Sequence, residues 1–167
     1  FSNLPNLTSF KAIFTNTSLV TDMASMFQNS DSILTFDISG MTTQLVEDMS
    51  YMFSGLTLIE LDIDHFITPR LINIEGMFSD MVNMTTLKIN GLITKNVTTM
   101  ENLFYGSSSL VTINFGDYFD TSSVTTMANM FRGTKIVNLD LSFFDTTHVI
   151  DMSYMFEGMS ELLGIDW

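Results

Sequence analysis

Residues 139–158 read LDLSFFDTTHVIDMSYMFEG, and the same order of residue types recurs along the chain at steps of 25 to 27 residues. A fixed period of this length is typical of repeat proteins, in which one repeat cannot bury its apolar face alone. We therefore expect the copies to stack, with one ring from each copy in a continuous inner column. The rings that mark the period are Phe1, Phe27, Phe53, Phe78, Phe104, Phe131 and Phe156.

An apolar pattern, Val-x-x-Met-x-x-Met-Phe or a close variant, leads to each phenylalanine after the first, as in residues 124–131. This spacing places the apolar residues on one stripe of a short helix. Two residues beyond each phenylalanine stands a residue that tolerates a left-handed backbone, which we interpret as a helix C-cap. These residues are Asn3, Asn29, Gly55, Asp80, Gly106, Gly133 and Gly158.

A second apolar pattern follows each phenylalanine, as at Leu58, Leu61 and Ile63, and its last two positions alternate like a strand with one buried face. Such short strands require parallel stacking, one per coil. The predicted fold class is an α/β repeat solenoid with one short parallel strand and one short helix per coil of about 26 residues. Six to seven coils fit into residues 1–167, and we expect this single segment to be a slice of a longer array whose caps lie elsewhere.

A threonine precedes each predicted helix and is interpreted as its N-cap. The alternative is a flat threonine array that organises water. The positions are Thr43, Thr68, Thr94, Thr121 and Thr146.

The order Leu-x-x-Leu-x-Leu, Phe-Asp-Thr and Val-x-x-Met-x-x-Met-Phe-x-Gly resembles the BspA-like leucine-rich-repeat surface proteins of microbes. Residues 139–158 carry the clearest copy, and residues 113–133, INFGDYFDTSSVTTMANMFRG, are nearly as close. The resemblance implies a leucine-rich-repeat-like solenoid displayed outside the cell, with roles in adhesion or partner binding. It implies no catalytic residues.

The composition limits the possible functions. Nineteen acidic and six basic side chains give a formal charge of −13, which disfavours nucleic acid and anionic membrane surfaces as partners. No apolar run is long enough to predict membrane insertion of this segment. Cysteine is absent, so disulfides, thiolate catalysis and cysteine zinc sites are excluded.

The strand positions that face away from the core are the candidate partner-binding face. Stacked strands lie about 4.8 Å apart, so Asp37 is expected beside Asp62. A Ca²⁺ site and a merely solvated acidic face are the alternatives to a ligand-binding face. The candidate residues are Lys11, Asp37, Glu60, Asp62, Asp64, Lys88, Asn114, Asp140 and Asp166.

No catalytic constellation is found in the sequence. His65 and His148 belong to distant coils, and neither a phosphate loop nor a zinc motif is present. The repeated methionines could suggest a soft-metal site, but they share a stripe with valine and phenylalanine and are better explained as core. We expect no enzyme activity, no cofactor and no metal.

Four sequons begin at Asn6, Asn16, Asn83 and Asn96 and are possible N-glycosylation sites. A chain this rich in asparagine, serine and threonine contains about as many by chance, so they carry little weight.

These observations predict a non-catalytic extracellular interaction or adhesion module at the cell surface, which presents an acidic face to a protein or glycan partner. One alternative is a structural component of a surface filament or stalk, built by end-to-end self-association of stacked repeats. A substrate-positioning arm of an enzyme with its catalytic domain elsewhere is the third.

Overall fold

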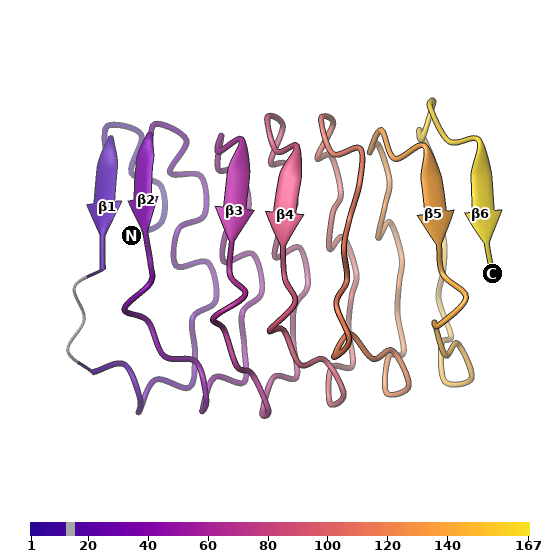
Figure 1. The fold of residues 1–167 in the computed structure, drawn as a ribbon, viewed down its shortest axis with the longest axis horizontal. Coiled ribbons are helices and arrows are strands. Elements are labelled where there is room, and N and C mark those ends of the chain that lie inside the picture. Colours follow the sequence, from indigo (N-terminus) through magenta and orange to yellow (C-terminus); the bar gives the residue numbers. More distant parts are fainter. Residues whose placement is uncertain (13–15) are drawn as a thin grey trace.

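The computed structural model describes residues 1–12 and 16–167 of the chain. The chain forms successive coils that lie side by side along the longest axis, with the strands parallel in one layer (Figure 1). Each strand has three residues. They are β1 (Ser9–Lys11), β2 (Thr35–Asp37), β3 (Glu60–Asp62), β4 (Thr86–Lys88), β5 (Asn138–Asp140) and β6 (Gly164–Asp166).

The strands pair in parallel as β1–β2, β3–β4 and β5–β6. The coil between β4 and β5 contributes only one bridge on this side, Lys88 to Asn114. A second row of parallel bridges, which we call the second ladder, connects six successive coils without interruption. It consists of Asp22, Asp48, Asn73, Thr99, Thr126 and Asp151. The two rows of backbone pairing therefore differ: one is continuous and the other is divided.

The predicted helices are not found: the described residues contain strands and turns but no helix. Two residues before each phenylalanine the backbone is left-handed, with φ between 54° and 57°, whereas a helix needs φ near −60° throughout. These residues are Ser25, Tyr51, Gly76, Asn102, Asn129 and Tyr154. The α/β leucine-rich-repeat solenoid with one helix per coil is therefore wrong. In keeping with this, no helix able to cross a membrane occurs in the described ranges.

Backbone hydrogen bonds show what replaces the helix. The N–H of Ser25 donates to the carbonyl oxygen of Ser50 at 2.8 Å, and that of Phe27 donates to Met52 at 3.0 Å. The intervening N–H of Met26 closes a local turn onto Met23 at 3.2 Å. Alternate amides thus bond to the next coil and to a turn within the same coil, so that each segment satisfies its backbone groups without a helix.

The second left-handed position was predicted correctly. All seven residues two positions beyond the phenylalanines have φ between 54° and 76°. They are turn residues rather than C-caps, since no helix precedes them.

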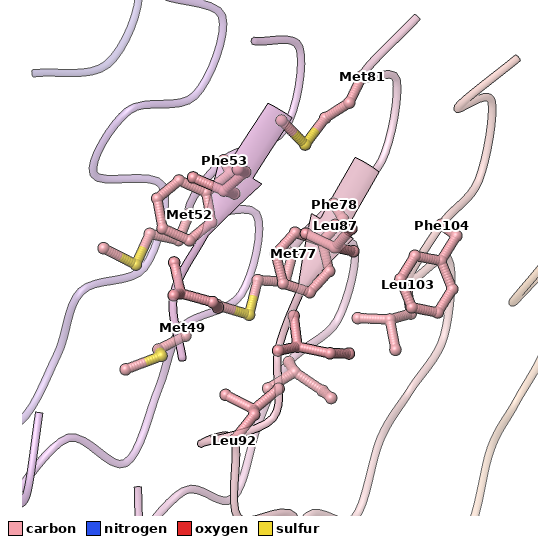
Figure 2. Packing of buried hydrophobic residues seen from close by; sticks show 14 of the residues in the cluster. Met49, Met52, Phe53, Met77, Phe78, Met81, Leu87, Leu92, Leu103 and Phe104 are labelled. Atoms are coloured by element: carbon pink, nitrogen blue, oxygen red, sulfur yellow. The ribbon is translucent and has the colours of Figure 1, made fainter. Parts of the chain in front are cut away.

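The inner column of phenylalanines is confirmed. Adjacent rings have centroids 5.6–6.2 Å apart and planes within 15° of parallel, from Phe1 to Phe156. Figure 2 shows Phe53, Phe78 and Phe104 in a row, with Met52 and Met77 packed beside them. Both methionines are fully buried, which confirms that they are core residues.

Four of the five predicted threonines are buried and bond from coil to coil, whereas Thr146 is only partly buried. Thr43 Oγ1 donates to the carbonyl oxygen of Ile67 and accepts the N–H of the same residue, both at 3.1 Å. Thr68, Thr94 and Thr121 form the same reciprocal pair with the next coil. The N-cap interpretation is wrong because there is no helix to cap, and burial removes these four hydroxyls from bulk water.

Candidate functional site

The strand layer is interrupted at two places. Among the described residues, β2 and β3 share no ladder pairing, and residues 112–116 share none with β5. We call the first interruption the first seam and the other the second seam. The second ladder passes both without a break.

The seams coincide with shorter connections between the column and the strand. Asp62 follows Phe53 by nine positions, and Asp140 follows Phe131 by nine. In the other five coils the corresponding residue follows its phenylalanine by ten. The rings and the second ladder keep the coils in register. The missing residue therefore shortens the connection to the strand and leaves the column unchanged. Each seam lies on the N-terminal side of a shortened coil.

Each seam makes room for an aromatic ring. In the close β3–β4 pair, the third residue after Lys88 is Gly91, and a Cβ atom there would overlap the carbonyl oxygen of Asp64. The corresponding residues beside the seams are His65, which follows Asp62, and Phe143, which follows Asp140. A side chain of this size is tolerated there because the preceding coil is not in ladder contact.

A groove of about 420 Å³ occupies the first seam. Asp37 and Ser39 line one side, and Glu60, Asp62 and His65 line the other. The Nε2 atom of His65 lies 3.1 Å from the carbonyl oxygen of Ile38, so that its ring spans the seam.

A larger groove of about 860 Å³ occupies the second seam. Its apolar lining includes Phe115, Phe119 and Phe143, and the rings of Phe115 and Phe143 have centroids 5.6 Å apart. Phe143 is 47% exposed, which is unusual for a phenylalanine in this chain of buried rings. Four carboxylates also line the groove: Asp117, Asp120, Asp140 and Asp145.

The predicted outward-facing row lies at the surface, but the pairs of neighbouring residues within it differ from those expected. Asp37 does not pair with Asp62, because the first seam separates their strands. Asp37 instead lies 3.8 Å from Lys11, and Asp62 lies 3.1 Å from Lys88. Asp140 pairs in register with Asp166. The remaining members, Glu60, Asp64 and Asn114, are exposed as well.

Several row residues also form turns, which the sequence analysis missed. Oδ1 of Asp37, Asp62 and Asp140 each accepts the backbone N–H two residues further on, at 2.9–3.1 Å. Asn114 does the same toward Gly116. The recurring Asp-x-Ser spacing was the available signal. Hydrogen bonds from Ser39 and Ser142 hold the pKa values of Asp37 and Asp140 below the usual range.

No group of three or more acidic, histidine or cysteine side chains in the described ranges is arranged to hold a metal ion. His65 and His148 contact different carbonyl oxygens, those of Ile38 and Ser122.

The four sequon asparagines, Asn6, Asn16, Asn83 and Asn96, are exposed. The side-chain amides of Asn83 and Asn96 donate to carbonyl oxygens of Thr57 and Pro69 in the preceding coil. Attachment of a glycan to either nitrogen would change these bonds.

Stacked coils joined by backbone ladders and a phenylalanine column define a repeat protein. The chain belongs to the DUF285 family, described as Mycoplasma protein of unknown function, which matches residues 6–109 and 72–164. No curated protein matches the chain, and no solved structure matches it. The resemblance to BspA-like leucine-rich-repeat proteins is therefore corrected: the family found is a different one, and the helix that the resemblance implied is absent.

Proposed function

We propose that the protein is a non-catalytic interaction module whose strand face binds a protein or glycan partner. The observation that carries this proposal is the groove of about 860 Å³ at the second seam. Its volume lies within the range of about 300–1,000 Å³ that is typical of ligand sites, and it combines apolar rings with a few polar groups.

The grooves support binding more strongly than the acidic row does. Turn formation already accounts for Asp37, Asp62 and Asp140, because each stabilises the end of its strand. It does not account for the exposed ring of Phe143, since Gly91 serves at the corresponding position of another coil. Contiguous apolar surface rimmed by polar groups is characteristic of interaction sites, and the ring of Phe143 adjoins that of Phe115 within the groove.

We also propose that the module acts at the cell surface. The exposed sequons are compatible with this location, although they are too few to argue for it alone. Intact cells that produce an epitope-tagged chain, treated with external protease, provide the test. Loss of the tag signal from unbroken cells is expected, and full protection would reject this part of the proposal.

Two charge-matched triple variants test the binding face. One replaces Asp37, Asp62 and Asp140 by asparagine, and the other replaces Asp22, Asp48 and Asp151 of the second ladder by asparagine. Each of the six residues accepts a backbone N–H two positions on, and asparagine can also accept it.

Binding would be measured on immobilised extracellular-matrix proteins and on a glycan array. The face variant should lose binding while the ladder variant retains it. Equal binding by both variants, or no binding of the parent chain to either surface, would reject the proposed function.

A further inference from the structure

We infer that the groove at the second seam takes a lysine or arginine side chain from an extended basic segment of a partner protein. This inference rests on the proposed function and specifies the chemistry of its partner. Two features of the groove carry it: an accessible ring and uncompensated carboxylates.

The first feature is the ring of Phe143. It is 47% exposed and lies against two other rings, with centroids 5.6 Å from Phe115 and 5.0 Å from Phe144. These neighbours restrict its motion, so a ligand that contacts it has little ordering cost to overcome. A cation over an aromatic face is attracted by the negative face of the ring.

The second feature is charge. None of the described residues that line the groove is lysine or arginine, whereas four are aspartates. Asp37 and Asp62 border the first seam, and each lies within ion-pair distance of a lysine on the strand paired with its own, Lys11 or Lys88. Asp140 borders the second seam, and its register partner on the paired strand is another aspartate, Asp166. The second groove therefore attracts a cation that the protein itself does not supply.

The carboxylates are available to such a cation. Oδ1 of Asp140 and Oδ1 of Asp145 accept the turn hydrogen bonds, at 2.9 Å in both cases. Oδ2 of neither residue makes a hydrogen bond within the described ranges. Hydrogen bonds from Ser142 and Thr147 lower the pKa of the two carboxyls, which are ionised at neutral pH.

The chain already contains the same combination elsewhere. The guanidinium carbon of Arg132 lies 5.7 Å from the ring centroid of Tyr105 and 5.4 Å from that of Tyr154. Its Nε atom is 2.7 Å from Oε2 of Glu157. Rings and a carboxylate thus hold an arginine within one chain, and the second groove offers rings and carboxylates without an occupant of this kind.

A basic peptide fits better than a neutral glycan. Both can lie against a ring, but only the cation is attracted by the long-range field of a chain with charge −13. A glycan remains an outcome that the test must be able to reveal.

The probe is a fluorescein-labelled peptide, Gly-Ser-Arg-Gly-Arg-Ser-Gly, with a citrulline peptide of the same sequence as its uncharged counterpart. Fluorescence anisotropy at about 150 mM salt suppresses diffuse charge attraction. The arginine peptide should bind at least about tenfold more tightly than the citrulline peptide. Phe143→Leu, which keeps an apolar side chain and removes the ring, should weaken binding about fivefold.

Asp140→Asn and Asp22→Asn form the matched pair, because each carboxylate accepts the backbone N–H two residues further on, while Asp22 belongs to the second ladder and does not line the groove. Asp140→Asn should weaken binding and Asp22→Asn should leave it unchanged. Circular dichroism and thermal unfolding confirm that each variant is folded.

Equal weakening by both asparagine variants would show diffuse attraction and overturn the inference, as would equal affinity for the two peptides. Competition by a neutral oligosaccharide that depends on Phe143 would assign the groove to a glycan instead. If Phe143→Leu binds the matrix proteins or glycans of the functional test as the parent does, this inference fails while the proposed function stands.

Discussion

Phe104 and Phe131 have the closest ring centroids in the column, 5.6 Å apart, although 27 positions separate them in the sequence, the largest step between successive column rings. The additional residue of this coil therefore does not displace the column. It is taken up in residues 115–120, which border the second groove. The core fixes the register, and differences in coil length appear on the strand side.

Phe104→Ala should lower the free energy of unfolding by about 3–5 kcal/mol, because it leaves a cavity between two stacked rings. Phe1→Ala is the control: Phe1 is 57% exposed, so its loss should cost much less. Urea unfolding followed by circular dichroism measures both. Similar costs for the two variants would contradict a continuous buried column.

Gly76→Ala should be destabilising by about 1–3 kcal/mol. Gly76 has φ +57°, and a Cβ atom there would overlap the ring of Tyr51 in the preceding coil. Tyr51→Ser removes the ring. Serine is the residue type at the equivalent position of the preceding coil, Ser25. In the double variant, Gly76→Ala should cost less than it does alone. An unchanged cost would show that backbone strain, rather than the ring, decides the effect.

Asp80→Gly should stabilise the fold by about 1 kcal/mol at neutral pH. Asp80 has φ +55°, and four other coils have glycine at this position. Burial raises the pKa of Asp80, so ionisation of its carboxyl costs the folded state more as pH rises above the ordinary value of 3.8. The gain should therefore be larger at pH 7 than at pH 3. Thermal unfolding at both pH values tests this, and a gain independent of pH would assign it to the backbone alone.

Acidification should destabilise the protein through carboxyls whose pKa is lowered by folding. Hydrogen bonds from Ser39, Asp64 and Ser142 lower the pKa of Asp37, Asp62 and Asp140. A lowered pKa contributes stability that is present above the unfolded value of 3.8 and is lost as pH falls through the folded value. The melting temperature should fall between about pH 4 and pH 2, and less in the triple asparagine variant of these residues. Parallel curves for parent and variant would contradict this assignment.

Insertion of one serine between Thr57 and Leu58 should close the first seam. It restores the ten-position distance from Phe53 to the strand, as in the coil that carries β2. The amide of Ile38 should then exchange more slowly with deuterium, because it gains a ladder acceptor. Insertion of a serine between Asn83 and Met84 serves as the control, since this coil already has ten positions. Unchanged exchange at Ile38 would show that connection length does not cause the seam.

Much of this architecture was accessible from the sequence. The column followed from the period of the phenylalanines, and the left-handed turns followed from Gly, Asn and Asp at one repeated position. The helix was predicted wrongly because turns that alternate with left-handed residues also place every third side chain inward. Tyr51 and Tyr154 gave no warning, since tyrosine is a poor indicator of a left-handed backbone.

The candidate site was harder to predict. The outward row was identified, but Asp37 and Asp62 were treated as neighbours because the sheet was taken to be continuous. The nine-position connections were visible in the sequence, but no structural consequence was drawn from them. His65 and Phe143 were not recognised as equivalent rings, because their equivalence appears only when the residues are counted from the strand rather than from the column.

The uninterrupted second ladder gives this architecture an asymmetric tolerance to change. The second ladder keeps the coils in register along one edge, while the connections on the strand side differ in length by single residues. Deletion of one codon in a connection can therefore open a groove on the strand face, while the phenylalanine column and the second ladder stay the same.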